Sequence, residues 1–271
     1  MPREPTTPDG VELVRKQVEA LDRRDLDGVM SDVTEDVVLD GRADFFEGRA
    51  AVRGFLDEWF RTYEELDFEL EEVSYLGGGV VFAVVIQDGR LVGSAGHIRQ
   101  REGWVYLCVG GLIARLTTSD VDEGRAAAER LAQERGQAVS QANVEVVRRV
   151  VAALNAHDLE GYLACCTEDV QLHTPVAAFS GAYEGREGIE RFFTDIEDAA
   201  PDFHVDPQDF KTVGSDQVLA FIQIRSTGRA SGIPMPMAAT NVYDLIDGKI
   251  SRLRVFLDHA EALKAVGLED G

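Results

Sequence analysis

Two residues in the second half of the chain have the side-chain types that proton transfer requires. His173 directly follows a predicted strand over 170–172, and Asp258 directly follows another over 250–257. A carboxylate or an imidazole that titrates near neutral pH would serve as the catalytic base of an enzyme. Both residues also have a structural interpretation. Strand alternation turns His173 away from the face of its apolar neighbours, and Asp258 stands at the N-cap of a predicted helix over 259–267.

A second group of residues suits ligand binding rather than proton transfer. Asn241 and Tyr243 lie two apart on a predicted strand, and the Asn241 amide is either a donor to a ligand carbonyl or a hydrogen-bonded sheet residue. Thr174 follows His173 on the opposite face. The segment 232–237 contains two prolines, so it is a loop or an edge whose methionines, Met235 included, would form an apolar lid. Aromatic and aliphatic residues that suit either a pocket wall or plain core are Ile189, Phe192, Phe193, Phe203 and Phe221.

The other residues with metal-binding or nucleophilic side chains form no recognisable site. The histidines are scattered, with no HxxxH, HxH or CxxC pair, so the sequence predicts neither a metal nor a cofactor. Cys165 and Cys166 are adjacent on a predicted helix and are interpreted as small core residues. The triplets Glu-Gly-Arg at 47–49 and 184–186 predict turns that need a glycine before a helix.

Composition limits the classes of partner. The net charge of −22 argues against nucleic acid and against anionic membrane surfaces, since both need clustered Lys and Arg. No apolar run reaches the length of a membrane span, and the first ten residues, MPREPTTPDG, lack the pattern of a signal peptide. The expected location is therefore the cytoplasm.

The elements that must position these residues occur twice. The stretch VELVRKQVEALDRRDLDGVMSDVTEDVVL at 11–39 returns as VEVVRRVVAALNAHDLEGYLACCTEDVQL at 144–172, with about half of the positions identical. Each copy reads as three helices followed by antiparallel strands, the pattern of an α+β fold. We expect a disordered lead (1–10), domain 1 (11–117, diverged), a helical linker (118–142) whose tail is flexible at 136–141, and domain 2 (143–271).

A curved sheet covered by helices on one face leaves its other face in need of a partner. The second copy can supply that partner, which predicts a monomer with an intramolecular pseudo-dimer. The alternative is a homodimer, in which each chain still has an exposed sheet to bury.

Three phrases of the second copy resemble the SnoaL-like branch of the NTF2-like superfamily: DLEGYLACCTEDVQLHTP, YEGREGIERFF and NVYDLIDGKISRLRVFLDHAEALKAVGL. The first copy matches well through Phe60 and then diverges. The resemblance implies two tandem cone-shaped α+β barrels, each with three helices against a curved antiparallel sheet. It also implies a range of activities, because relatives include ketosteroid isomerases, polyketide cyclases, epoxide hydrolases and proteins that only bind ligands.

The sequence lacks the residues that the two enzyme mechanisms suggested by the resemblance require. A ketosteroid isomerase needs a carboxylate base, an acid on a late strand and a tyrosine on the first helix. In the second and first copies, respectively, the base position falls on Thr174 and Gly41 and the late-strand acid on Thr240 and Gly103. The tyrosine position falls on Val150 and Gln17. The paired acids of tandem epoxide hydrolases have only Asp40 and Asp44 as candidates, both displaced from the expected place.

The leading hypothesis is therefore binding of a small, largely apolar metabolite in the cone of domain 2, with domain 1 as a degenerate structural partner. The alternative is a polyketide-cyclase-like or isomerase/epoxide-hydrolase-like enzyme that uses His173 and Asp258. A third possibility is a scaffold whose cones are filled by Trp104 and the phenylalanines. An enzyme requires His173 or Asp258 in the cavity, a binder requires an open cavity without them, and a scaffold requires closed cones.

Overall fold

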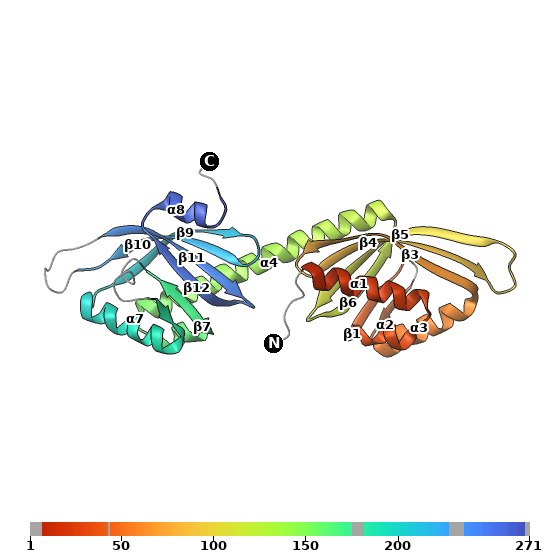
Figure 1. The fold of residues 1–271 in the computed structure, drawn as a ribbon, viewed down its shortest axis with the longest axis horizontal. Coiled ribbons are helices and arrows are strands. Elements are labelled where there is room, and N and C mark those ends of the chain that lie inside the picture. Colours follow the sequence, from red (N-terminus) through yellow and green to blue (C-terminus); the bar gives the residue numbers. More distant parts are fainter. Residues whose placement is uncertain (1–6, 43, 175–181, 228–235, 269–271) are drawn as a thin grey trace. The chain divides into compact units, whose positions relative to one another are not determined.

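The computed structural model describes residues 7–42, 44–174, 182–227 and 236–268 (Figure 1). Contacts divide the chain into two compact units, Met1–Gly136 (unit 1) and Gln137–Gly271 (unit 2). The elements of unit 1 are α1 (Thr7–Asp22), α2 (Leu26–Ser31), β1 (Val33–Asp40), β2 (Phe45–Glu47), α3 (Arg49–Thr62), β3 (Tyr63–Gly77), β4 (Val80–Leu91), β5 (His97–Val109) and β6 (Leu112–Ser119). Helix α4 (Val121–Asn155) contributes to both units, and unit 2 continues with α5 (Leu159–Ala164), β7 (Cys166–His173), β8 (Tyr183–Glu184), α7 (Gly185–Ala199), β9 (His204–Val213), β10 (Gln217–Arg225), β11 (Met237–Ile246), β12 (Lys249–Phe256) and α8 (His259–Ala265).

Both units contain the same six-stranded sheet. The strand order is β2-β1-β6-β5-β4-β3 in unit 1 and β8-β7-β12-β11-β10-β9 in unit 2. Each unit is an α+β fold, and the two occur in tandem, as the sequence predicts. One detail differs, because β1 runs parallel to β6 and β7 runs parallel to β12. The first and last strands of each unit are far apart in sequence, so nothing forces a hairpin between them. In the described residues each sheet stays open at its two edge strands.

The helices cover the inner face of each sheet with the apolar stripes that the sequence predicts. In α1, Val14, Val18 and Leu21 are at most 4% exposed, and in the second part of α4 Val147 and Val151 play the same role.

Turn chemistry also repeats between the units. The Asp25 carboxylate accepts a hydrogen bond from the Gly28 amide at 2.9 Å, which caps α2, and Asp158 caps α5 in the same way. Gly48 and Gly185, the glycines of the two Glu-Gly-Arg triplets, have φ of +87° and +61°, which fits the predicted turns.

The outer face of each sheet is covered by a helix of its own unit. Figure 1 shows α4 over the sheet of unit 1 and α8 over the sheet of unit 2. The first part of α4 buries Ala128 and Ala132 against β4 and β5, and α8 buries Ala262 and Leu263 against Leu219 on β10 and against β11. This cover was not foreseen from the sequence, which assigned the role to the other copy. The internal pseudo-dimer and the homodimer both remain predictions.

Several local expectations need correction. Helix α1 begins at Thr7 and not at residue 11, since a proline is tolerated in the first turn of a helix. Residues 97–109 form one strand rather than two, because Glu102 and Gly103 pair with β4 in the ladder. Residues 136–141 are helical, not a flexible tail.

No helix in the described part of the chain is both long and apolar enough to cross a membrane.

Gly136 lies inside the long helix α4, and this position offers a direct stability test. A Cβ atom added there would meet nothing within 4 Å, and φ is not positive. Glycine weakens a helix interior by about 1 kcal/mol relative to alanine. We therefore expect Gly136→Ala to raise the free energy of unfolding by about 1 kcal/mol in urea denaturation. A loss of stability would mean that the helix is broken at this position in solution.

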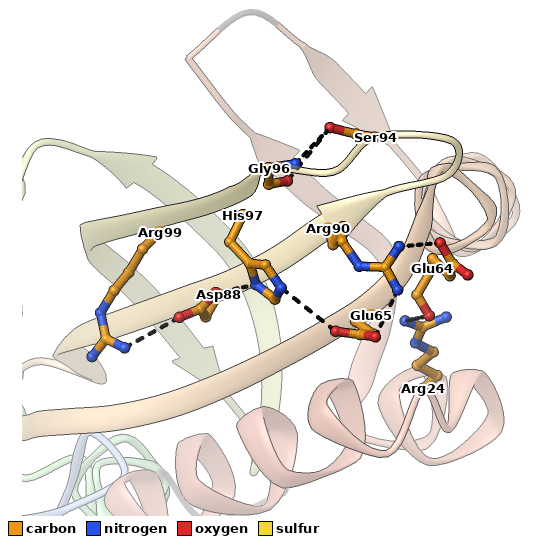
Figure 2. A network of polar contacts seen from close by, with 9 residues as sticks. All are labelled: Arg24, Glu64, Glu65, Asp88, Arg90, Ser94, Gly96, His97 and Arg99. Carbon is orange, nitrogen blue, oxygen red and sulfur yellow. Dashed lines mark hydrogen bonds and ion pairs between the residues drawn. The ribbon is translucent and has the colours of Figure 1, made fainter.

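A network of charges ties together β3 and the long hairpin of β4 and β5 (Figure 2). Arg90 forms ion pairs with Glu64 and, at 2.7 Å, with Glu65, and it lowers the pKa of the Glu65 carboxyl through that hydrogen bond. His97 lies between Asp88 at 3.2 Å and Glu65 at 3.6 Å. Exposed ion pairs of this kind contribute little stability individually, but they favour one register among the three strands.

Candidate functional site

Unit 2 encloses a cavity of about 570 Å³ between its helices and the inner face of its sheet. Its wall is predominantly apolar. The residues that line it are Val150, Val151, Leu154, Tyr162, Leu172, Thr174, Tyr183, Phe192, Asp195, Ile196, Ala199, Ala200, Phe203, Val205, Ile222, Ile224, Ser226, Met237, Asn241, Tyr243, Leu253, Val255 and Leu257.

Strand alternation explains which sheet residues reach the cavity. Where a strand contributes more than one lining residue, these are an even number of positions apart, for example Ile222 and Ile224 on β10 and Asn241 and Tyr243 on β11. From the helical side, Val150 and Val151 on α4 and Phe192 on α7 complete the wall. The sequence thus builds an apolar chamber by presenting one face of each element.

Asn241 and Tyr243 form the buried polar group of this wall. The Asn241 Nδ2 donates a hydrogen bond to the Tyr243 hydroxyl at 3.1 Å, and the two residues are 5% and 2% exposed. The Asn241 Oδ1 has no hydrogen-bond partner among the described residues. Burial raises the pKa of Tyr243 to about 12, so this phenol is neutral at physiological pH. The pair therefore offers hydrogen bonds without a charge.

Two further tyrosines line the cavity and were missed by the sequence analysis. Burial raises the pKa of Tyr162 far above its ordinary value. The Tyr183 hydroxyl donates to the Asp195 carboxylate at 2.8 Å, and burial followed by this hydrogen bond raises the Tyr183 pKa. One signal was present in the sequence, because Tyr162 replaces Val29 of the first copy at the repeat offset. A polar residue in one copy that replaces an apolar residue in the other is therefore the signal that could have identified this cavity residue.

The two proposed catalytic residues lie outside this cavity. His173 is exposed at the end of β7, while its neighbours Leu172 and Thr174 line the wall, as alternation requires. Asp258 is exposed and caps α8, where its carboxylate accepts a hydrogen bond from the Glu261 amide at 3.1 Å. The structure does not bring the two residues together at the cavity.

Some of the proposed ligand-binding residues line the cavity of unit 2, and others do not. Asn241, Thr174, Tyr243 and Phe192 line the cavity. Phe221 does not: it lies on the opposite face of β10, where its ring packs 4.7 Å from that of His259. The reason is again alternation, because Phe221 stands between the inward residues Ala220 and Ile222. Met235 lies outside the described residues. Of the other predicted wall residues, Phe203 lines the cavity, whereas Ile189 and Phe193 belong to the core.

Unit 1 keeps a cavity of its own, of about 300 Å³. Trp104 forms part of its wall instead of filling it, so the cone is not closed in the way a scaffold requires. Several lining residues are polar or charged, among them Gln17, Gln87 and Glu102. From the sequence, domain 1 was expected to be a degenerate structural partner, so these polar residues were assigned no binding role.

None of the three cysteines forms a disulfide. All three are buried and free, and Cys166 begins β7 instead of lying on a helix. Burial raises the pKa of Cys108 to about 11 and that of Cys166 to about 12, and it also raises the pKa of Cys165. Since the thiolate is the reactive form, we expect none of them to react readily with dithionitrobenzoate at pH 8 in the folded protein. All three should react in guanidinium chloride, and a fast thiol in the native protein would contradict the buried placement.

The described residues contain no group of three or more histidine, cysteine or acidic side chains that could hold a metal ion. The polar side chains that line the cavity of unit 2 are three phenols, the amide of Asn241, the carboxylate of Asp195 and the hydroxyls of Thr174 and Ser226.

Comparison with known proteins identifies the same duplication. The SnoaL-like domain family matches residues 14–116 and again 147–253, one match in each unit. A search of curated protein sequences finds no match.

Solved structures similar to the chain each correspond to about one copy. An NTF2-like protein of unknown function from Burkholderia pseudomallei is 20% identical and covers 46% of this chain and 97% of its own, with a TM-score of 0.40. A putative polyketide cyclase from Xanthomonas campestris is 19% identical, with 47% and 98% covered and a TM-score of 0.39. RV0760c from Mycobacterium tuberculosis, solved with estradiol-17beta-hemisuccinate, is 18% identical, with 44% and 95% covered and a TM-score of 0.39.

Proposed function

Because the chain belongs to the SnoaL-like domain family and carries that domain twice, we propose that it binds a small, largely apolar molecule in the cavity of unit 2. The observation that carries this proposal is the wall itself. It is a chamber of about 570 Å³, bounded by aliphatic and aromatic side chains with a few polar groups. The one carboxylate among them, Asp195, accepts a hydrogen bond from the Tyr183 hydroxyl. Pockets of this size and character are typical of small-molecule sites.

The polar groups limit the kind of molecule. The Tyr243 hydroxyl receives a hydrogen bond from Asn241, and no described residue accepts its own proton. It is therefore available to donate to a ligand carbonyl or ether oxygen. The Asn241 Oδ1, buried and without a partner among the described residues, would be satisfied by a ligand hydroxyl near the same place. The expected ligand is an apolar, mostly aromatic or alicyclic body with a carbonyl or hydroxyl at one end.

A binding role accounts for the wall better than the enzymatic alternative does. The acid–base pair proposed from the sequence, His173 and Asp258, is exposed and absent from the lining, and Asp258 is already used as a helix cap. The buried tyrosines have raised pKa values, so they hold their protons at neutral pH and do not serve as bases. These features support a site that holds its ligand by burial and hydrogen bonding.

The test is a titration with N-phenylnaphthylamine, a neutral aromatic probe whose emission rises in apolar surroundings. We expect saturable binding of one probe per chain at low concentration. Asn241→Leu with Tyr243→Phe should leave binding of this probe nearly unchanged, because it lacks a carbonyl, and should weaken binding of a hydroxylated naphthyl ketone about tenfold. If the protein gives no saturable signal, or if the double variant affects both molecules equally, the proposal is wrong.

A further inference from the structure

The cavities of the two units are built from the same positions but have different polarity. The register of the sheets identifies the matches, since Ala83 pairs with Trp104 in unit 1 as Ala220 pairs with Asn241 in unit 2. In this register Ala83 of β4 matches Ala220 of β10, so Gln87 of β4 matches Ile224 of β10. The matched strands border the cavity of their own unit.

Three glutamines of unit 1 stand where unit 2 has apolar residues. Besides Gln87, which matches Ile224, they are Gln17 and Gln100. The repeat offset of the first helices matches Gln17 with Val150, and the sheet register matches Gln100 with Met237. All six line their own unit's cavity. Gln17 and Gln87 are buried, whereas Gln100 is exposed. A buried glutamine costs desolvation that a core does not need, so the two buried glutamines at this wall indicate a site that recognises polar groups.

Two buried side-chain carbonyl oxygens at this wall are open hydrogen-bond acceptors, those of Gln17 and Gln87. Gln17 is 4% exposed, and its Oε1 has no hydrogen-bond partner among the described residues. Gln87 is 6% exposed and uses its Nε2 to donate to the Tyr63 hydroxyl at 3.1 Å, which leaves its carbonyl oxygen as the acceptor. A ligand that supplies N–H groups at this wall would complete these hydrogen bonds.

A carboxylate strengthens the same preference. The side chain of Glu102 is 16% exposed, lines the cavity and accepts a hydrogen bond from the Trp104 indole at 3.2 Å. Asp44 adds a second carboxylate to the lining. One cation, Arg42, also lines the cavity and lies 3.8 Å from Glu102, but it forms its closer pair with Asp120 at 2.6 Å. Aromatic faces that favour cations line the same cavity, namely Phe55, Trp59 and Trp104. The net charge of −22 also attracts a cation and repels an anion.

From these observations we infer that the cavity of unit 1 is a second ligand site, specific for a small organic amine in its protonated form. The ammonium group would donate to Glu102 and to the glutamine carbonyls, and an apolar body would lie against the tryptophans. This site is independent of what unit 2 binds. It gives the duplicated chain two sites of different chemistry.

Tryptophan emission tests this inference without interference from unit 2. The chain has two tryptophans, Trp59 and Trp104, and both line the cavity of unit 1. The probe is benzylammonium, with benzyl alcohol and benzoate as matched molecules that carry the same ring and a neutral or negative head group. We expect a saturable change in emission with benzylammonium, a weaker response with the alcohol and none with benzoate.

Two variants separate recognition from folding. Glu102→Gln keeps an acceptor for the Trp104 indole and should weaken benzylammonium binding about tenfold or more. Gln17→Val with Gln87→Ile installs the residues of unit 2 and should abolish binding, while the Gln17 change raises the melting temperature by removing an unpaired buried amide oxygen. As a matched control, Val150→Gln with Ile224→Gln in unit 2 should leave the benzylammonium titration unchanged.

Three outcomes would overturn the inference. One is the absence of a saturable response to benzylammonium in the wild-type protein. Another is a response to benzoate that equals the response to the amine. The last is unchanged affinity in Glu102→Gln, because the carboxylate would then contribute nothing to recognition. Melting curves of each variant show that the folded protein is the species measured.

Discussion

Replacing Val150 and Ile224 by glutamine is expected to weaken binding of N-phenylnaphthylamine about a hundredfold or more. Both residues line the cavity of unit 2, and the substitutions introduce the side chains that unit 1 carries at the matching positions. Each new amide must lose its water when an apolar probe enters, and the probe returns no hydrogen bond, which costs about 1–3 kcal/mol per site. The measurement is a fluorescence titration of the purified double variant.

Glutamine at these positions is compatible with the fold, because Gln17 and Gln87 occupy the equivalent places in unit 1. The matched control is His173→Ala, which changes an exposed residue outside the cavity and should leave the affinity for the probe as it is in the wild-type protein. If the double variant melts like the wild type and binds the probe with unchanged affinity, the probe binds elsewhere and the assignment of this cavity fails.

Asn155→Leu should produce a large loss of stability, because it removes an anchor between α4 and β9. The Asn155 side chain bonds both backbone groups of Val205, since its Nδ2 donates to the carbonyl and its Oδ1 accepts from the amide, each at 2.8 Å. Val205 is 3% exposed and lines the cavity, so neither group finds water when the asparagine is removed. Two buried unsatisfied groups predict a loss of about 2–4 kcal/mol in the free energy of unfolding.

Unit 1 supplies the matched variant for this prediction. There, Asp22 occupies the same helical position and accepts one hydrogen bond from the Phe68 amide at 2.8 Å. Asn155→Asp keeps the acceptor and loses the donor, so it should cost about half as much as Asn155→Leu. Urea denaturation followed by circular dichroism gives both values. Equal stability of Asn155→Leu and the wild type would show that this anchor does not form in solution.

The fold could be predicted because its signals are local and repeated. The apolar stripe of Val14, Val18 and Leu21 is buried and returns in the second copy, where Val147 and Val151 are buried and Leu154 is partly buried. The Asp247-Gly248 turn has φ of +50° and +70°, the backbone that a tight hairpin requires. The helices on the outer faces could not be predicted in the same way, because small alanines in α4 carry no strong apolar pattern and their burial depends on tertiary packing.

The candidate site was only partly predictable. Alternation places Leu172 and Thr174 at the wall and His173 outside, as the period of a strand requires. Phe221 was assigned to the wrong face because β10 is buried on both faces. Apolar residues therefore occupy nearly every position of this strand, and the sequence does not show which of them point toward the cavity. Gln17 was visible in the sequence as a polar residue within an apolar stripe, but the other polar residues of its cavity come from distant strands that only the fold brings near.

A crystal structure of the protein with N-phenylnaphthylamine tests the central claim most directly. We predict that the probe lies in the cavity of unit 2, with its rings against Ile222, Leu253 and Phe192, and that the cavity of unit 1 does not contain it. Electron density for the probe at the surface, or a unit 2 whose side chains have closed the chamber, would contradict the account.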